Sequence, residues 1–477
     1  MASYTAPGVY IKDQVSGVQT ISQASASIGA MLGLTASGVL NTPVKIGSWS
    51  EFIQNFANGL DTPFLANSYL PYAVYGFFQN GGAELYVVSV KGAGAAKATA
   101  PSANVLVATA ASEGTWGNGL RVKVTKNEDW SSTNLVYDVT FTLGDNTITV
   151  KELTISNIVD TLNADKSVAQ WFGKFSLKAE TTALAEEEYT LSGGANGATL
   201  TDTNITDALA YFDTVVDEIT LIGIPGQTSA AINTALLAYT DNNGLFPILD
   251  APIGSTAQQV KTLRKGTTAW TGCLAWPWGK INDPLTETIK DVPTVGHVMG
   301  VYARTILNRG VFKAPAGVDA VVRGFVDMEH LVTQSELSML NPLGVVCVMP
   351  RPNAGIVLWG ARSLNSADST MRYVSDGLLN LNIKRSLYQG SQFAVFEPNT
   401  ELLWNTVRSM CISFLENLRR EGALKGNASE AYYVVVDKSN NTEYTINEGQ
   451  LIIDVGYAPV KPAEFVVFRL AHSIVSQ

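Results

Sequence analysis

The chain has 477 residues, of which 46% are hydrophobic and 16% are charged. This composition excludes a disordered chain and indicates an ordered protein of roughly two to four domains with a weakly charged surface. The formal net charge of −10 opposes binding to DNA or to an anionic membrane, so neither direct nucleic-acid contact nor direct membrane insertion is expected.

The sequence carries no targeting or ligand-binding signature. Residues 1–14 lack a basic start followed by an apolar run, so we expect no secretory signal. The longest weakly polar run, residues 28–40, is interrupted by glycines and is too short to span a bilayer. The cysteines Cys273, Cys347 and Cys411 are far apart, which predicts buried free thiols. We therefore expect a protein made in a cytoplasm, with no metal and no cofactor.

The N-terminal region begins with an isolated strand. Residues 3–12 contain a Pro-Gly turn signal followed by the alternating residues Val9, Tyr10 and Ile11. Periodicity alone leaves open whether this strand pairs within its own subunit or with another copy of the chain.

Residues 28–90 alternate strand-like runs with two expected helices, residues 50–56 and 67–80, and end in a strand at 85–90. Residues 92–97 then look like the start of a dinucleotide loop. The third glycine is absent and an Ala- and Pro-rich stretch follows, so we expect no nucleotide site there.

Residues 103–200 have a different pattern, with short alternating strands separated by turn residues and one helix near 155–162. The expected strands are 105–107, 120–124, 136–141, 147–150 and 175–178. The pattern predicts a β-sandwich or small barrel inserted into an α/β domain. The Gly-rich segment 192–197 lacks the Lys-Ser or Lys-Thr of a phosphate loop, so we interpret it as a turn.

The αβ alternation resumes at Asp207. Helices are expected at 207–215 and 229–240, and strands at 219–224, 246–252, 271–275, 297–302 and 344–349. Because these strands are almost continuously apolar, they predict a sheet buried on both faces.

A serine hydrolase is the enzymatic alternative, because Asp250 ends a buried strand, where α/β enzymes place catalytic carboxylates. Such an enzyme needs a His base and an activated Ser. No Gly-x-Ser-x-Gly and no His-Glu-x-x-His motif is present, and the histidines are only three. We expect His297 at a strand start, His330 on a solvated face and His472 in a terminal arm. We therefore predict no catalytic residue and a turn hydrogen bond for Asp250.

The C-terminal region organises the rest of the chain. Residues 396–399 are expected to end a strand and start a helix, with Asn399 or Thr400 as cap. The helix places eight apolar residues on one face: Leu403, Trp404, Val407, Met410, Cys411, Phe414, Leu415 and Leu418. Strands 432–437 and 451–455 then predict a hairpin with a long connection.

One last strand, residues 465–470, is separated from this hairpin by Pro459 and Pro462. Its unpaired backbone groups must find a sheet edge, and another copy of the chain can supply one.

The motifs of this region closely resemble those of contractile tail sheath proteins of bacteriophages and related injection machines. The runs are FEPN, LW, FLENL, AYYVVVD and YAPVKPAEFVVFRL. Upstream, VYART, RGVFKAPAG, LNPLGV and LWGARSL extend the resemblance, as do PGVY and AVYGFFQNGG. Residues 125–190 carry little of it.

The resemblance implies a multidomain α/β protein with linking arms that complete a neighbour's sheet. The expected parts are an N-terminal arm (1–22), a subtilisin-like α/β middle domain (23–96 and 203–365), an inserted outer β-sandwich (97–202), an inner α+β domain (366–458) and a C-terminal arm (459–477). The arms would act through Val9, Tyr10 and Ile11 and through Phe465, Val466, Val467, Phe468 and Arg469.

The resemblance also places the inner domain against a tail tube. Arg408 and Arg419 are eleven residues apart and share one side of the helix, so we expect them to meet acidic groups on the tube. Lys384, Arg385 and Arg420 add positive charge in the same domain. A plain solvated helix face is the structural alternative.

The resemblance thus implies a structural subunit, not an enzyme, that polymerises as rings of sixfold symmetry and contracts to drive a tube through a cell envelope. The expected partners are further copies of itself, the tube protein, and baseplate and tail terminator proteins. We expect it in the virion, assembled in the host cytoplasm. A bacteriocin-like or other injection particle, a static filament and a subtilisin-like hydrolase are the alternatives.

Overall fold

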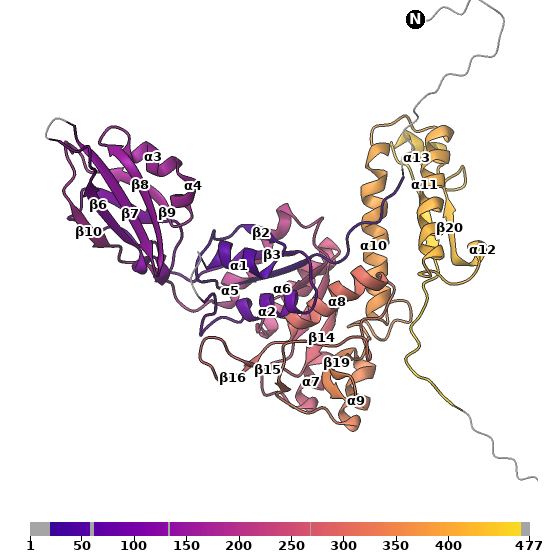
Figure 1. Cartoon of the computed structure of the whole chain (residues 1–477). Helices are drawn as coiled ribbons and strands as arrows, with labels where there is room; N and C mark the ends of the chain where they lie inside the picture. Colours follow the sequence, from indigo (N-terminus) through magenta and orange to yellow (C-terminus); the bar gives the residue numbers. More distant parts are fainter. Residues whose placement is uncertain (1–19, 58–61, 132–133, 268, 469–477) are drawn as a thin grey trace, which may run out of the picture. The chain divides into compact units, whose positions relative to one another are not determined.

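The computed structural model describes residues 20–57, 62–131, 134–267 and 269–468. These divide into two compact units (Figure 1). The large unit contains residues 25–382 and the segment from Lys461 onward, and the small unit contains residues 20–24 and 383–460. The boundary between them falls inside the helix α10 (Val374–Ser391) and again after Val460.

An eight-stranded sheet forms the centre of the large unit, in the order β19-β18-β14-β13-β12-β1-β3-β2. Its six inner strands are parallel, and β2 and β19 pair antiparallel at the two edges. The strands are β1 (Gly29–Gly33), β2 (Pro43–Ile46), β3 (Leu85–Ser89), β12 (Leu221–Gly223), β13 (Phe246–Asp250), β14 (Cys273–Trp276), β18 (Val345–Arg351) and β19 (Gly355–Trp359).

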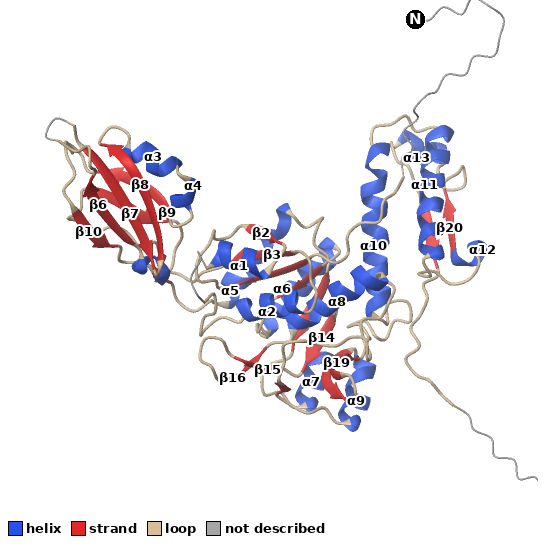
Figure 2. Cartoon of the chain, in the orientation of Figure 1, coloured by secondary structure: helices blue, strands red, loops and turns tan. Residues whose placement is uncertain are grey.

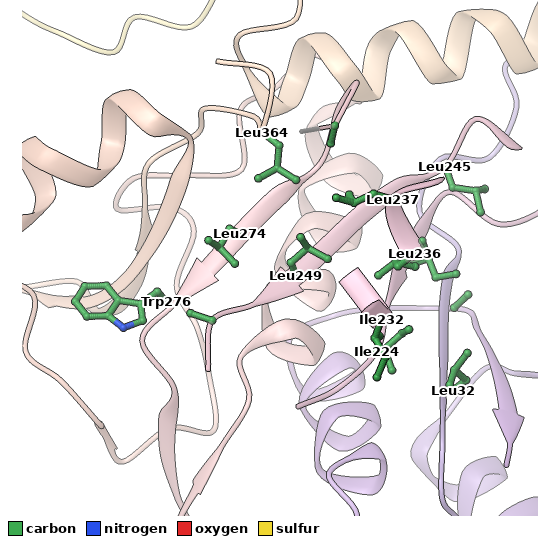
Figure 3. Close-up of a cluster of buried hydrophobic side chains, with 14 of the residues drawn as sticks. Leu32, Ile224, Ile232, Leu236, Leu237, Leu245, Leu249, Leu274, Trp276 and Leu364 are labelled. Atoms are coloured by element: carbon green, nitrogen blue, oxygen red, sulfur yellow. The ribbon is translucent and has the colours of Figure 1, made fainter. Parts of the chain in front are cut away.

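Both faces of this sheet are buried, as the apolar strands predicted. In β1, for example, Ala30 and Leu32 join the core on one face and Met31 joins the core on the other. Figure 3 shows the first core, which includes Leu249 and Leu274 of the sheet and Ile232, Leu236 and Leu237 of α6. Its helices are α5 (Asp202–Ala208), α6 (Ala230–Asn243), α7 (Ala257–Lys265) and α9 (Gln334–Leu340), with 3-10 turns at Leu209–Thr214 and Asn341–Leu343.

The opposite face is covered by α1 (Trp49–Phe56), α2 (Leu70–Gln79), α8 (Val295–Arg309) and the start of α10. Residues 297–302, predicted as a strand, lie inside α8, so that prediction was wrong. The helix is buried on nearly all sides over its first nine residues, and such a helix shows the continuous apolar run of a buried strand.

Glycines allow α2 and α8 to pack closely. A Cβ added to Gly296 would lie 2.1 Å from the carbonyl oxygen of Ala73, and one at Gly300 would lie 2.4 Å from that of Phe77. A Cβ at Gly76 would meet the ring of His297 at 2.4 Å. No side chain fits between the helices at these three positions.

We predict that Gly296→Ala lowers the free energy of unfolding by about 1–3 kcal/mol, because the added methyl group must push the helices apart. Gly266→Ala is the control, since its Cβ would come no closer than 3.5 Å to any atom and its φ is negative. Urea unfolding of both variants measures the difference. Equal stability of the two variants would contradict the packing argument.

Residues 98–192 form a body of their own within the large unit, with a separate hydrophobic core. It contains a four-stranded antiparallel sheet in the order β10-β6-β7-β8 and a two-stranded sheet of β5 and β9, and both sheets contribute side chains to that core. Its elements are β5 (Leu106–Ala110), a 3-10 turn (Thr115–Gly119), β6 (Arg121–Lys126), β7 (Val136–Leu143), β8 (Asn146–Thr154), α3 (Ile158–Ala164), α4 (Lys166–Ala169), β9 (Phe172–Leu177) and β10 (Glu187–Thr190).

The two Gly-rich segments of the sequence pair with each other at the neck of this body. β4 (Ala95–Ala96) is antiparallel to β11 (Ala195–Asn196), and Thr99 and Ser192 exchange backbone hydrogen bonds of 2.9 Å. A Cβ at Gly92 would lie 2.0 Å from the Ala198 carbonyl oxygen. The glycines thus serve the close approach of two chain segments. Residues 192–197, interpreted from the sequence as a turn, instead pair with residues 95–99, so that interpretation was wrong.

The remaining elements complete the two units. In the large unit, β16 (Ile289–Val292), β15 (Gly279–Asn282) and β17 (Asp327–Met328) form a small antiparallel sheet. The small unit contains the end of α10, a 3-10 turn (Gln392–Ala394), α11 (Glu401–Arg420), α12 (Ala428–Ala431), β20 (Tyr432–Val435), α13 (Glu443–Asn447) and β21 (Asp454–Tyr457) (Figure 2). Phe396 follows the 3-10 turn and does not end a strand, so that expectation was wrong.

Candidate assembly site

The helix α11 gives the small unit its core. Seven of the eight apolar residues that the sequence placed on one face are buried, and Leu403 is half-buried. Thr400 is the N-cap but makes no side-chain hydrogen bond to the helix. Asn399 instead accepts a 2.6 Å bond from the Trp404 indole N–H and donates to the Gln450 carbonyl. The start of the helix is therefore held by tertiary contacts.

The predicted hairpin is present, with β20 antiparallel to β21 and β20 packed beside α11 (Figure 2). Its long connection is fixed by Asn441, whose side-chain amide bonds both the N–H and the carbonyl of Ile452. Within the described residues no third strand pairs with either member. Each strand therefore presents an edge that can accept another strand.

The positive residues predicted to meet a partner are distributed over two helices, Lys384 and Arg385 on α10 and the other three on α11. Arg419 donates two hydrogen bonds, of 2.8 and 2.7 Å, to Glu416, and Arg420 adds a third. The hydrogen bond from Arg419 is the main cause that lowers the pKa of Glu416 to about 2. The charges of Arg419 and Arg420 are thus partly balanced inside the subunit.

Arg408 is exposed, and the structure gives it no ion pair within 4.0 Å among the described residues. The charge of Arg408 does act on Asp437. The pKa of Asp437 is lowered chiefly by hydrogen bonds from Ser439, and the charge of Arg408 lowers it further. Lys384 and Arg385 make interactions of their own. Of the five predicted residues, Arg408 is therefore the one best placed to meet an external acidic group.

The C-terminal segment is attached to the large unit by two charged residues. Glu464 accepts hydrogen bonds from Arg362 Nε and Nη2 at 2.9 and 2.8 Å, from Asn341 Nδ2 at 2.5 Å and from the Tyr373 hydroxyl at 3.2 Å. Lys461 Nζ lies 2.7 Å from a carboxylate oxygen of Asp376. The sequence analysis missed this attachment, because its partners lie about 90 to 120 residues away in the chain.

The electrostatics of these two pairs differ. Burial opposes ionisation of Glu464, but the hydrogen bonds from Arg362 and Asn341 outweigh it, so the pKa of Glu464 is lowered. Burial of Asp376 has the larger effect there, and its pKa is raised even though Lys461 acts in the opposite direction. Of the two carboxylates, Glu464 therefore has the stronger tendency to stay ionised, and Asp376 the weaker.

Directly after Glu464 the side chains lie in solvent. Phe465, Val466, Val467 and Phe468 are 72%, 73%, 77% and 85% exposed. The described residues 465–468 form no strand in the single chain, so pairing within the subunit is not found for them, and pairing with another copy stays a prediction. Arg469 and the N-terminal residues Val9, Tyr10 and Ile11 lie outside the described residues.

The residues considered for catalysis serve the fold. Asp250 accepts hydrogen bonds from the N–H groups of Gly226, Thr294 and Val295, at the start of α8, and not from a local turn as predicted. Burial raises its pKa to about 7 despite these donors. The carboxylate therefore caps a helix that is distant in sequence.

The three cysteines are buried and free, as predicted. His297 is buried in α8, and its ring centroid lies 3.9 Å from that of Phe325. His330 lies 3.0 Å from a carboxylate oxygen of Glu336, and its ring is tilted by 35° against that of Trp276. His330 is 39% exposed, so it lies on a partly rather than fully solvated face. His472 lies outside the described residues. Neither described histidine is hydrogen-bonded to a Ser, a Cys or Asp250 in the part of the chain that the structure covers.

In the described ranges no helix is long and apolar enough to cross a membrane. Nor do the His, Cys, Asp and Glu side chains placed by the structure include a group of three that could hold a metal ion.

His297 makes the stability of the large unit pH-dependent. Burial lowers its pKa to about 3, from an ordinary value of 6.5, so between these values the unfolded chain binds a proton that the folded chain does not. This stability is complete above about pH 6.5 and is lost as the pH falls. His297 by itself should contribute a loss of about 2 kcal/mol at pH 5. The raised pKa of Asp250 acts in the opposite direction over the same range, because the folded chain then binds a proton that the unfolded chain does not, so the His297 contribution is obtained by comparing variants.

Urea unfolding at pH 7.5 and pH 5 tests this expectation. His297→Gln removes the titrating group, so its loss on acidification should be smaller by that amount. His330→Gln is the matched control, because that ring is partly exposed. An identical pH dependence in the wild type and in His297→Gln would contradict the assignment.

The fold thus combines a buried parallel sheet, an inserted β body and a small unit with open strand edges. The phage tail sheath protein central domain matches residues 198–364, and the phage tail sheath C-terminal domain matches residues 367–472. Together these ranges cover more than half of the chain. The chain belongs to the phage tail sheath family.

Curated relatives and solved structures agree with this assignment. The tail sheath proteins of Burkholderia phage BcepMu and Escherichia phage P2 are both 24% identical over 257 and 258 residues, 51% and 52% of this chain. The matches span 52% and 62% of those relatives, so the chain spans little more than half their length.

Among solved structures, the contracted helical sheath of the anti-feeding prophage has a TM-score of 0.62 at 23% identity, covering 99% of this chain and 100% of that one. The contracted sheath complex of the extracellular contractile injection system PVC gives 0.62 at 20%, covering 99% of both. The sheath tail protein of Desulfitobacterium hafniense gives 0.64 at 16%, covering 90% and 94%. These likenesses establish the shared fold.

Proposed function

We propose that this protein is the subunit of a contractile tail sheath. It polymerises as stacked rings, of sixfold symmetry, around a tail tube, and the rings repack to drive the tube through a cell envelope. It is a structural component of the particle and not an enzyme. Its partners are copies of itself, the tube, and baseplate and tail terminator proteins, met during assembly in the host cytoplasm.

The observation that carries this proposal is the combination of two unpaired strand edges with an exposed apolar chain segment. The hairpin β20–β21 accepts a strand, and residues 465–468 have unpaired backbone groups and large exposed side chains. Because extended segments add to exposed sheet edges, one subunit can complete the sheet of the next. A heterologous contact of this kind repeats without closing on itself, as a helical sheath requires.

Finer parts of the proposal rest on the family resemblance. The parallel sheet of the large unit corresponds to a subtilisin-like middle domain, and residues 97–202 to an outer β-sandwich. Residues 366–458 correspond to the inner, tube-facing domain, and residues 1–22 and 459–477 to linking arms. In this arrangement the outer body varies without disturbing the inner connections.

A second candidate is the sheath of an injection particle that carries no phage genome. The full-length fold likeness to the anti-feeding prophage and PVC sheaths favours it, because those structures cover almost the whole chain. The genes beside this one decide between the two, since capsid and terminase genes accompany a phage.

Truncation after Glu464 tests the linking role of the C-terminal segment. The change removes the exposed apolar run but keeps Lys461 and Glu464 bound to the large unit. We expect the full-length chain, supplied with tube protein, to form hollow ridged cylinders by negative-stain electron microscopy, and the truncated chain to form none.

Cylinders from the truncated chain in equal number would contradict the linking role. Discrete monomers in every sample, even with tube and baseplate supplied, would contradict the sheath itself.

Arg408→Glu tests the tube-facing surface. The substitution leaves the described ion pairs intact and places a negative charge where we propose an acidic tube surface. Because a partly wet charge contact is worth about 1 kcal/mol or less but recurs in every subunit, we expect sheath assembly on the tube to fall about threefold to tenfold. Co-sedimentation with tube protein measures it.

Arg408→Lys is the matched control and should assemble like the wild type. Equal co-sedimentation of Arg408→Glu and Arg408→Lys would remove Arg408 from the tube contact, and with it the charge argument for this helix.

A further inference from the structure

The exposed apolar segment begins at a sharp boundary in the chain. Glu464 has a side chain only 17% exposed, whereas the next residue, Phe465, is 72% exposed. Lys461 and Glu464 lie on either side of the half-buried Pro462, in extended chain that is neither helix nor strand. The two residues hold this short segment by charge pairs of opposite polarity, Lys461 to Asp376 and Glu464 to Arg362.

The partners form one receiving surface. Arg362 and Tyr373 face each other in an antiparallel bridge within the connection from β19 to α10, and Asp376 lies in the first turn of α10. Asn341 completes the surface from the end of α9. All of them belong to the large unit, as does the segment that they hold.

The contact has the geometry of a strong attachment. Arg362 is itself 16% exposed and binds Glu464 through two nitrogens at once, which fixes both distance and orientation. The Asp376 side chain is 2% exposed and lies 2.7 Å from Lys461. The Arg362–Glu464 pair is shielded from water on both sides and is therefore screened little by salt, whereas Lys461 is 39% exposed and its pair is screened more.

Without this attachment, a pulling force on residues 465–468 would act directly on residues 458–460. Residues 458–460 hold to the small unit by single backbone bonds, such as Val460 N–H to Ala423 O at 3.0 Å and Lys425 N–H to Ala458 O at 2.8 Å. A pull from beyond Val460 would break these bonds one after another and then separate β21 from β20. With the attachment in place, the same pull is transmitted to the large unit.

We propose that Glu464 and Arg362, assisted by Lys461 and Asp376, anchor the C-terminal segment of each subunit to its own large unit while residues 465–468 are held by a second copy. This inference rests on the proposed sheath function. The anchor fixes where the segment leaves the subunit and protects the hairpin β20–β21 from being peeled apart during repacking.

The other end of the chain has its base in the small unit. Ile21 is buried where Gly390 of α10 leaves no room for a Cβ, which would lie 2.6 Å from the Ile21 side chain. The Ala24 N–H donates to the Ser386 hydroxyl at 2.9 Å. The two terminal segments thus start from different units, and the anchor keeps the C-terminal one on the large unit.

The first experiment uses the full-length subunit in isolation. Glu464→Gln keeps the size of the side chain but removes the charge that binds Arg362. Proteinase K cleavage within residues 459–464, mapped by mass spectrometry, should become roughly 10- to 100-fold faster, while the rest of the chain stays resistant. Glu401→Gln is the matched control, because it removes the exposed pair of Glu401 with Lys438 and should leave this cleavage unchanged.

The second experiment uses cylinders assembled with tube protein and exposed to rising urea. Glu464→Gln cylinders should dissociate at a lower urea concentration than wild-type or Glu401→Gln cylinders. The exchange Glu464→Arg with Arg362→Glu should restore part of the difference, since it reverses the pair without removing it.

The cleavage and the urea measurements distinguish a failure of the anchor proposal from a failure of the sheath proposal. Cleavage unchanged by Glu464→Gln, or cylinders as resistant as the wild type, would overturn the anchor. A wild-type chain that forms no cylinders would overturn the sheath function, and with it the role of the anchor between copies.

Discussion

The double burial of the parallel sheet is the constraint on which the other features depend. Because both faces of the sheet are covered by helices, its strands are apolar throughout, and every functional surface must lie elsewhere. The sheet end that carries Asp250 is closed by the start of α8, so the carboxylate serves as a cap. What remains for binding is the periphery: the small unit, the inserted body and the terminal segments.

The sequence predicted those helices and strands whose apolar residues recur with a regular period within a short stretch of the chain. The apolar face of α11 and most of the buried strands were found where the periodicity placed them. The long-connection hairpin was also found, with its second strand at Asp454–Tyr457 and not at 451–455. The main error, a strand at residues 297–302, arose because a helix buried on nearly all sides loses the 3.6-residue pattern. The strand expected at 465–468 is not formed in the single chain because a strand needs a partner, and its pairing with another copy stays a prediction.

The candidate site was predictable only in part. The exposed apolar run after two prolines is visible in the sequence, and so is the basic character of α11. The pairing of Arg419 with Glu416, and of Glu464 with Arg362, is not, because ion pairs depend on orientation and on residues distant in the chain. These pairs change the interpretation of the site. They divide the charged residues into those already used inside the subunit and those, such as Arg408, that have no such use among the described ion pairs.

The neck of the inserted body has a consequence for how such chains diversify. The segments entering and leaving residues 98–192 are hydrogen-bonded to each other, through β4 with β11 and through Thr99 with Ser192. The body also has its own hydrophobic core, so its folding does not draw on the central sheet. Because the two ends of the insertion are held together, the insertion connects the flanking strands of the central sheet as a short closed loop would, whatever its length. Besides this neck, few bonds connect the body to the rest of the large unit, such as the one from the Gly38 N–H to the Ser112 hydroxyl at 3.0 Å. Selection can therefore change the length of the body with few compensating changes near the strands on either side of it.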